Sequence, residues 1–205
     1  MTKVFLIRHG ETEWNVKGKY LGLTDLPLTE KGETQAKALA KYLEDEPISF
    51  LYCSNLERAK STAKAVAEAK GLEIIIKPGL NEVDFGEWEG LTYTEIKAKY
   101  GNLIDDWLNN TPKVAIPEGE SWSLFESRVV KTFSSIVSRN NGQTVAVVTH
   151  GGVIKVILSR VLGIEASFFK IRQDKGALNI VEFFDDGTAA ITLMNSTCYQ
   201  RIYNI

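Results

Sequence analysis

The sequence predicts an α/β fold built on an open, mostly parallel sheet with helices on both of its faces. Short apolar runs at 4–7, 50–53, 74–76 and 145–148 are continuous rather than alternating, as expected of strands that are buried on both faces. Helical patterns lie between these runs, so the order along the chain is β-α-β-α-β. In such sheets, ligands bind beyond the carboxyl ends of the strands.

Helix signals fill the gaps between the predicted strands. Thr29 is a candidate N-cap for a helix whose apolar positions recur at i, i+3, i+4 and i+7, namely Ala36, Leu39, Ala40 and Leu43. The residues from Ser54 to Glu57 fit a capping box that opens a second helix, extending to about Lys70. A third, largely apolar helix is predicted over residues 153–162.

The middle and the end of the chain follow different patterns. No strand is predicted between residues 91 and 140, where helices are expected near 92–109 and 121–139, separated by Pro112 and Pro117. We interpret this stretch as a helical insertion that roofs a site. Residues 179–184 and 189–194 are then predicted to form a hairpin, because Asp185-Asp186-Gly187 between them is a turn signal.

The bulk composition excludes several classes of partner. The 205 residues are 44% hydrophobic and 24% charged, with a formal net charge of −2, so there is no overall basic field for nucleic acid or an anionic membrane. No run reaches the roughly 18 apolar residues of a membrane span, and the first apolar stretch is too short for a signal peptide. We therefore expect a cytoplasmic protein with a single domain over residues 1–205.

The two histidines of the chain occupy equivalent places. His9 follows the first predicted strand within Arg8-His9-Gly10, and His150 follows the fourth within Thr149-His150-Gly151-Gly152. Arg58 lies in the first turn of the helix that follows the second strand. These residues should therefore converge at the carboxyl edge of the sheet.

This group of side chains suits a phosphoryl group. Arginine presents a planar fork of donors to phosphate oxygens, and helix N-termini add backbone N–H groups. A histidine held neutral among cations is a competent nucleophile. A phosphohistidine mechanism also needs a carboxylic acid for the leaving oxygen, and spacing alone leaves four candidates open: Glu82, Asp84, Glu87 and Glu89.

Several motifs together resemble the histidine phosphatase superfamily, whose best-known branch is the cofactor-dependent phosphoglycerate mutases. Arg8-His9-Gly10 alone is a weak motif, but further matching blocks follow in family order along most of the chain: Glu11-Thr12, Trp14-Asn15, Asp25 to Thr29, Ser54 to Ala59, Leu80 to Glu82, Gly86 to Gly90, and Thr149 to Gly152.

The resemblance implies a three-layer α/β/α sandwich, catalysis without a metal or cofactor, and a role for each matched residue. His9 matches the phosphorylated nucleophile, and Glu82 matches the proton donor. The phosphate pocket is matched by Arg8, Arg58, Asn15, His150 and Gly151. Leu21-Gly22 stands where many family phosphatases have glutamine before glycine, so substrate contacts cannot be transferred from that loop. We interpret Glu87 and Glu89 as solvated and Asp84 as structural.

The sequence therefore predicts a phosphatase acting on a small-molecule phosphomonoester through a phosphohistidine on His9. A phosphoglycerate mutase is the first alternative, although the compact segment between Glu82 and His150 favours hydrolysis; a non-catalytic phosphometabolite-binding protein is the second. Two histidines crowded by arginines make a poor metal site. The segment from Phe169 to Cys198 resembles α-ribazole phosphatases and metal-independent phosphoserine phosphatases, although Tyr199 stands where that branch often has histidine. We expect α-ribazole 5′-phosphate first as the substrate, phosphoserine next, and a broad-specificity phosphatase after that. The oligomeric state, a homodimer included, stays open.

Overall fold

In a computed structural model, which describes residues 1–109, 114–164 and 170–205, one six-stranded sheet forms the centre of the molecule. The strand order is β3-β2-β4-β1-β5-β6. The strands are β1 (Thr2–Arg8), β2 (Phe50–Cys53), β3 (Ile74–Ile76), β4 (Thr144–Thr149), β5 (Leu178–Phe183) and β6 (Ala189–Ser196). The first four are mutually parallel, whereas β5 pairs antiparallel with β1 and β6 pairs antiparallel with β5. All six predicted strands are therefore present, and the sheet is mostly parallel as expected.

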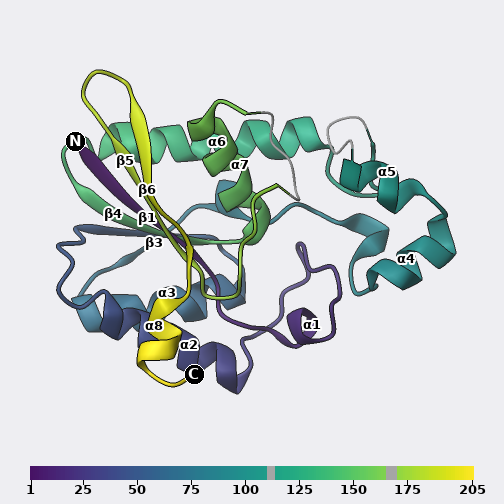
Figure 1. Cartoon of the computed structure of the whole chain (residues 1–205), viewed down its shortest axis with the longest axis horizontal. Coiled ribbons are helices and arrows are strands. Elements are labelled where there is room, and N and C mark those ends of the chain that lie inside the picture. Colours follow the sequence, from purple (N-terminus) through teal and green to yellow (C-terminus); the bar gives the residue numbers. More distant parts are fainter. Residues whose placement is uncertain (110–113, 165–169) are drawn as a thin grey trace.

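Helices cover both faces of this sheet, which gives the three layers that the sequence predicted (Figure 1). Helices α2 (Glu30–Tyr42), α3 (Glu57–Lys70) and α8 (Cys198–Ile202) lie on one face, and α6 (Trp122–Arg139) and α7 (Gly151–Leu162) lie on the other. The remaining helices are α1 (Glu13–Val16), α4 (Tyr93–Tyr100) and α5 (Leu103–Asn109), with 3-10 turns η1 (Pro78–Leu80) and η2 (Gly86–Trp88).

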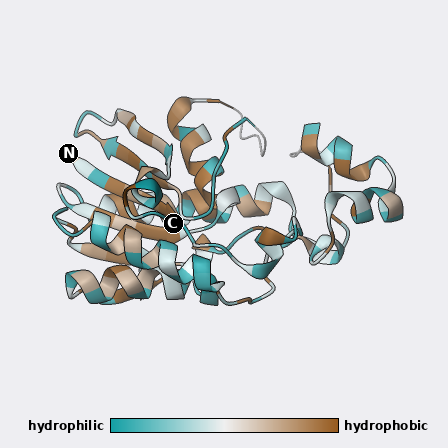
Figure 2. Ribbon diagram, turned by 60° about the horizontal axis from the view of Figure 1, so that its bottom comes forward, coloured by the Kyte–Doolittle hydropathy of each residue, from teal (hydrophilic) through white to brown (hydrophobic). Residues whose placement is uncertain are grey.

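Strand β1 shows why its apolar run is continuous. Val4 and Leu6 point into the core beneath α6 and α7, while Phe5 and Ile7 point into the core against α2 and α3. Alternate side chains of a strand face opposite sides, so a strand covered on both faces needs apolar residues at every position. Figure 2 shows the same pattern as largely brown strands at the centre of the molecule.

Local capping agrees with the sequence at one helix and disagrees at another. Thr29 caps α2 as predicted, since its side chain accepts a hydrogen bond from the backbone N–H of Gly32. The capping box predicted at Ser54 is wrong: α3 begins at Glu57, its N-cap is Leu56, and no side chain caps it. The Ser54 hydroxyl instead faces the centre of the molecule, where it bonds His150 and Asn81.

The stretch between residues 91 and 140 is helical in its described part, and Pro112 lies outside the described residues. The predicted first helical region is interrupted at Gly101, whose φ of 64° ends α4. Helices α4 and α5 extend to one side of the sheet (Figure 1), whereas α6 packs against α7 within one helical layer. Helix α6 of this stretch therefore packs into the core, and the first residue of α4, Tyr93, lines the cavity described below.

Candidate active site

The pairing of β1 with β4 brings the two histidines together. The strands are parallel and in register from Lys3 with Thr144 to Arg8 with Thr149. The next residue on each strand is a histidine, so His9 and His150 leave the same sheet edge side by side. Their ring centroids are 5.1 Å apart. This is the convergence at the carboxyl edge that the sequence predicted.

His9 is held in the tautomer that a nucleophile needs. Its Nδ1 lies 2.7 Å from the carbonyl oxygen of Gly10, and because a carbonyl can only accept, Nδ1 carries the proton. The lone pair therefore lies on Nε2. Burial, followed by the charges of Arg58 and Arg8, holds the pKa of His9 well below its usual value. The imidazole is consequently neutral at physiological pH.

His150 is oriented by Ser54, whose hydroxyl is in turn fixed by the side chain of Asn81. Its Nε2 lies 2.8 Å from the Ser54 hydroxyl, which donates to Asn81 Oδ1 at 2.8 Å and accepts from the backbone N–H of Leu56. Nε2 is therefore the donor, and Nδ1 is buried without a hydrogen-bond partner in the described part of the chain. A buried ring nitrogen of this kind indicates a ligand at the site. Burial and Arg58 also hold the pKa of His150 well below its usual value.

The two arginines surround the histidines with positive charge. Arg58 is fully buried and donates to the carbonyl oxygens of Gly22 (2.6 Å) and Thr24 (3.0 Å), and Arg8 donates to the carbonyl of Gln173. Burial lowers the pKa of Arg58 to about 10 and also lowers that of Arg8. In the described residues, Nε of each arginine is buried and unpaired. The burial cost of two cations with unpaired donors is offset when an anion shares the site.

Glu82 is the acidic side chain that lines the same cavity as His9. It is 7% exposed, and two backbone N–H groups fix its carboxylate: Val83 donates to Oε1 at 3.1 Å and Gly152 donates to Oε2 at 3.0 Å. Gly152 is in the first turn of α7, two residues after His150. The carboxylate is therefore fixed at the N-terminus of α7, in the cavity that His9 also lines.

The other three acidic candidates have structural contacts instead. Asp84 accepts from the backbone N–H of Gly86, which fits its predicted structural role, and Glu87 is exposed and bonded to Tyr100, which fits a solvated position. The solvated interpretation of Glu89 is wrong. Its two carboxylate oxygens accept the backbone N–H groups of Leu23 and Thr24 at 2.6 and 2.7 Å, so it fixes the loop whose carbonyls receive Arg58.

A cavity of about 350 Å³ opens above these residues. It is lined by five of the predicted site residues, Arg8, His9, Asn15, Glu82 and Gly151. Arg58 and His150 lie behind this lining, buried next to it. A larger groove of about 810 Å³ between α2 and α3 is lined by none of the predicted site residues. The candidate active site is therefore identified by the chemistry of its side chains and not by the volume of the cavity.

Several lining residues were not predicted from the sequence. They are Gly18, Lys19, Tyr20, Phe85, Tyr93, Gly152 and Lys155, and Leu21 lines the cavity with apolar surface. Lys155 had a visible signal, since it is the one cation among apolar residues from Val153 to Leu158 of α7. Among the described residues of the predicted insertion, Tyr93 is the one that lines this cavity.

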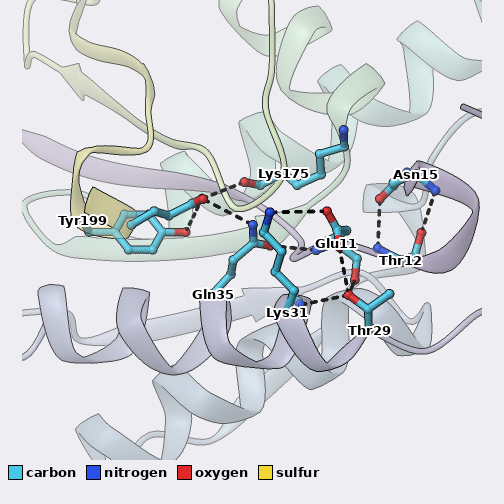
Figure 3. Close-up of polar contacts among 10 residues, drawn as sticks. Glu11, Thr12, Asn15, Thr29, Lys31, Gln35, Lys175 and Tyr199 are labelled. Atoms are coloured by element: carbon cyan, nitrogen blue, oxygen red, sulfur yellow. Dashed lines mark hydrogen bonds and ion pairs between the residues drawn. The ribbon is translucent and has the colours of Figure 1, made fainter. Parts of the chain in front are cut away.

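The loop that follows β1 and contains Glu11 is supported by Gln35 of α2 and by residues near Tyr199 in α8 (Figure 3). The Tyr199 hydroxyl donates to the carbonyl of Gly176 at 2.6 Å, and the N–H of Gly176 donates to the carbonyl of His9 at 3.0 Å. Gln35 accepts from the N–H of Glu11 at 2.9 Å and donates to Gln200 at 3.3 Å. The backbone on both sides of Gly10 is therefore fixed by residues distant in sequence.

Gly10 and Asn15 also owe their positions to close local packing. A Cβ on Gly10 would lie 2.5 Å from the carbonyl oxygen of Gly32, so glycine is required there by backbone packing against α2 rather than by the approach of a ligand. Asn15 forms a capping box with Thr12 (Figure 3): its Oδ1 accepts the N–H of Thr12 at 3.2 Å. The amide nitrogen is then the end of Asn15 that is available to the cavity.

No group of three His, Cys, Asp or Glu side chains is placed to hold a metal ion in the described part of the chain. None of the described helices is long and apolar enough to cross a membrane.

The fold and the site thus define an α/β protein with paired histidines in a cationic pocket, the arrangement of a phosphoryl-transfer protein. The sequence profile of the histidine phosphatase superfamily (branch 1) matches residues 4–197. The chain belongs to this superfamily, and it is a phosphatase of it.

Two of the similar proteins are a phosphoserine phosphatase and an alpha-ribazole phosphatase. The chain is 34% identical over 200 residues to phosphoserine phosphatase 1 of Hydrogenobacter thermophilus, covering 97% of this chain and 94% of that protein. It is 35% identical over 205 residues to the adenosylcobalamin/alpha-ribazole phosphatase of Salmonella typhimurium, covering 97% and 98%.

Solved structures agree with the fold. Bacillus stearothermophilus YhfR has a TM-score of 0.90 and 31% identity, over 97% of this chain and 99% of that one. A phosphoserine phosphatase mutant from Entamoeba histolytica in complex with phosphoserine has a TM-score of 0.86 and 30% identity, over 97% and 99%.

Proposed function

We propose that this phosphatase hydrolyses a small phosphomonoester in two steps through a phosphohistidine on His9. In the first step, Nε2 of His9 attacks phosphorus, an N–P bond forms and the ester P–O bond breaks. Protonated Glu82 gives its proton to the leaving oxygen. In the second step, Glu82 as carboxylate takes a proton from water, whose oxygen attacks phosphorus as the N–P bond breaks, and inorganic phosphate leaves.

The observation that carries this proposal is the tautomer of His9. The bond from Nδ1 to the carbonyl of Gly10 puts the lone pair on Nε2, in a buried and cationic environment that keeps the ring neutral. We propose that Arg8, Arg58, Asn15 and the N-terminus of α7 at Gly151 donate to the phosphoryl oxygens. His150 joins them through Nδ1 once this nitrogen takes up a proton, which the negative charge of the bound phosphate favours. Preorganised donors of this kind stabilise the charge that develops on those oxygens in the transition state.

For the substrate we propose two candidates, α-ribazole 5′-phosphate and phosphoserine. Relatives that carry each of these names are about equally similar to this chain, at 35% and 34% identity. The cavity of about 350 Å³ is at the small end for a ligand site, which fits a small metabolite rather than a phosphoprotein.

The test is phosphate release from a panel of phosphomonoesters in the presence of EDTA, comparing the wild type with His9→Ala. The panel contains α-ribazole 5′-phosphate, phosphoserine, 3-phosphoglycerate and a generic aryl phosphate. Release that disappears in His9→Ala, and a phosphohistidine trapped by rapid quench of the wild type, would support the proposal. Exchange between phosphoglycerates without net release would instead indicate a mutase, and binding without turnover a phosphometabolite-binding protein.

A further inference from the structure

Lys155 is a charged residue of the cavity for which the proposed two-step reaction has no use. It is on α7, three residues after Gly152 and four after Gly151, so the three positions share one face of the helix. All three line the cavity. Helical side chains lean toward the N-terminus of their helix, and Gly151 and Gly152 have no side chains to obstruct this path. The Lys155 side chain is therefore directed along the cavity wall toward Glu82.

The position of Lys155 relative to Glu82 indicates which part of a substrate it meets. Gly152 donates its N–H to Glu82 Oε2, and Lys155 is about 4.5 Å further along the helix axis. Glu82 is the acid that protonates the leaving oxygen. A group attached to that oxygen, on the side away from phosphorus, is therefore held near Glu82, where Lys155 also lines the cavity.

The electrostatic environment supports the same placement. Burial is the largest effect and lowers the pKa of Lys155 to about 8, and among the charges around it Glu82 comes before Arg8. The charges of Arg58 and Arg8 act on His9, so these two cations lie beside the proposed nucleophile. Lys155 lies close to Glu82, and we place it next to the acid that serves the alcohol part of the substrate.

Because Lys155 is half-buried in the cavity wall, an anion that a substrate brings there interacts with it more strongly than with a lysine in open solvent. We propose that Lys155 is a specificity-determining residue that binds a carboxylate on the leaving group, so that the substrate is a small aliphatic phosphomonoester carrying a carboxylate near its ester oxygen. This inference rests on the proposed function. It favours phosphoserine-like compounds over α-ribazole 5′-phosphate, which has no carboxylate.

The test compares two substrates that differ in the carboxylate alone, phosphoserine and phosphoethanolamine. The wild type should prefer phosphoserine in kcat/KM by about 10- to 100-fold, the range of a hydrogen bond between charged groups. Lys155→Met keeps the length of the apolar stem and should remove most of this preference, whereas Lys155→Arg should retain a substantial part of it. Lys19→Met is the matched control, because Lys19 also lines the cavity and its removal should change the preference much less.

Three outcomes would overturn the inference. A wild type without preference for phosphoserine has no carboxylate subsite. An equal loss for both substrates in Lys155→Met would mean that Lys155 acts on the phosphoryl group. An equal effect of Lys19→Met and Lys155→Met would mean that the general positive field of the cavity is responsible.

A binding measurement separates failure of this inference from failure of the proposed function. Calorimetry on His9→Ala, with and without Lys155→Met, gives the affinities for phosphoserine and phosphoethanolamine without turnover. If no compound is hydrolysed by the wild type but Lys155→Met removes an affinity difference of about 10- to 100-fold, the proposed reaction is wrong and the carboxylate subsite stands. If hydrolysis depends on His9 and the affinity difference is absent, the proposed reaction stands and the carboxylate subsite is wrong.

Discussion

Replacing Glu82 by glutamine should slow this enzyme by an amount that depends on the leaving group. The carboxylate is nearly isosteric with the amide, and it is fixed by the N–H groups of Val83 and Gly152. The oxygen of the new amide can keep one of these bonds, while the amide nitrogen would face the other donor. The substitution thus removes the transferable proton and disturbs the position of the side chain only at one contact.

The size of the effect follows from how much help the leaving oxygen needs. General acid catalysis contributes about 10²- to 10⁴-fold. For an alkyl phosphate, whose alkoxide is a very poor leaving group, we expect Glu82→Gln to reduce kcat/KM by that whole factor. For p-nitrophenyl phosphate, whose phenolate leaves without protonation, the loss should stay within about tenfold, which allows roughly 1.4 kcal/mol for the disturbed contact.

The assay is phosphate release from a series of aryl and alkyl phosphates of increasing leaving-group pKa. The logarithm of kcat/KM should fall more steeply with leaving-group pKa in Glu82→Gln than in the wild type. Asp84→Asn is the matched control, because Asp84 neighbours the same segment but accepts the N–H of Gly86; its slope should equal that of the wild type. Parallel lines for Glu82→Gln and the wild type would refute the assignment of Glu82 as the acid.

Three further predictions concern the support of the site. Tyr199→Phe leaves the carbonyl of Gly176 without its side-chain donor, so the free energy of unfolding should fall by about 1–3 kcal/mol. The melting temperature should fall by about 2–4 °C for each kcal/mol lost. In kinetic assays, kcat should fall by a larger factor than KM changes. Gly10→Ala brings a Cβ to 2.5 Å from the Gly32 carbonyl oxygen and should cost about 1–3 kcal/mol in thermal unfolding together with most of the activity. His9 and His150 have lowered pKa values in the native state, so below about pH 6.5 the unfolded state binds more protons than the native state. Lowering the pH therefore favours unfolding. Denaturant titrations should show a free energy of unfolding about 2–3 kcal/mol lower at about pH 5.5 than at about pH 7.5.

Each of these predictions has a control. Tyr42→Phe removes a hydroxyl that contacts Cys198 on the same side of the sheet, and an equal drop in kcat there would contradict the positioning role of Tyr199. Among the described residues, a Cβ at Gly163 meets no atom within 4 Å, so Gly163→Ala bears only the φ of 65°, at a cost of about 1 kcal/mol. An inactive Gly163→Ala would contradict the packing argument. His9→Gln should roughly halve the pH effect, and an unchanged pH slope would show that other groups cause it.

Much of the fold could be predicted from the sequence because its signals are local. The continuous apolar runs of β1 and β4 report burial on both faces, which is a property of each strand alone. Thr29 caps α2 through a backbone donor only three residues away, at Gly32. His9, His150 and Arg58 could be placed at one edge because each follows a strand of a parallel sheet.

The same local rules failed where a distant partner competes for a side chain. Ser54 fits a capping box, but in the folded chain its hydroxyl orients His150, 96 residues away. Glu89 lies in an acidic stretch typical of solvated loops, yet the N–H groups of Leu23 and Thr24 reach its carboxylate. A carboxylate that satisfies two otherwise unpaired backbone donors is more stable there than in solvent contact alone, and sequence spacing does not contain that information.

The sequence by itself thus determined the layered α/β architecture, the superfamily and the residues proposed for the phosphoryl end of the site. The tertiary structure decided how those residues work together. The register of β1 with β4 sets the 5.1 Å between the two imidazoles, and the carbonyl of Gly10 selects the tautomer of His9. The turn of α7 directs Lys155 into the cavity. Burial, strand register and competition for hydrogen bonds all depend on residues that are far apart in the chain. These effects therefore arise only once the chain has folded.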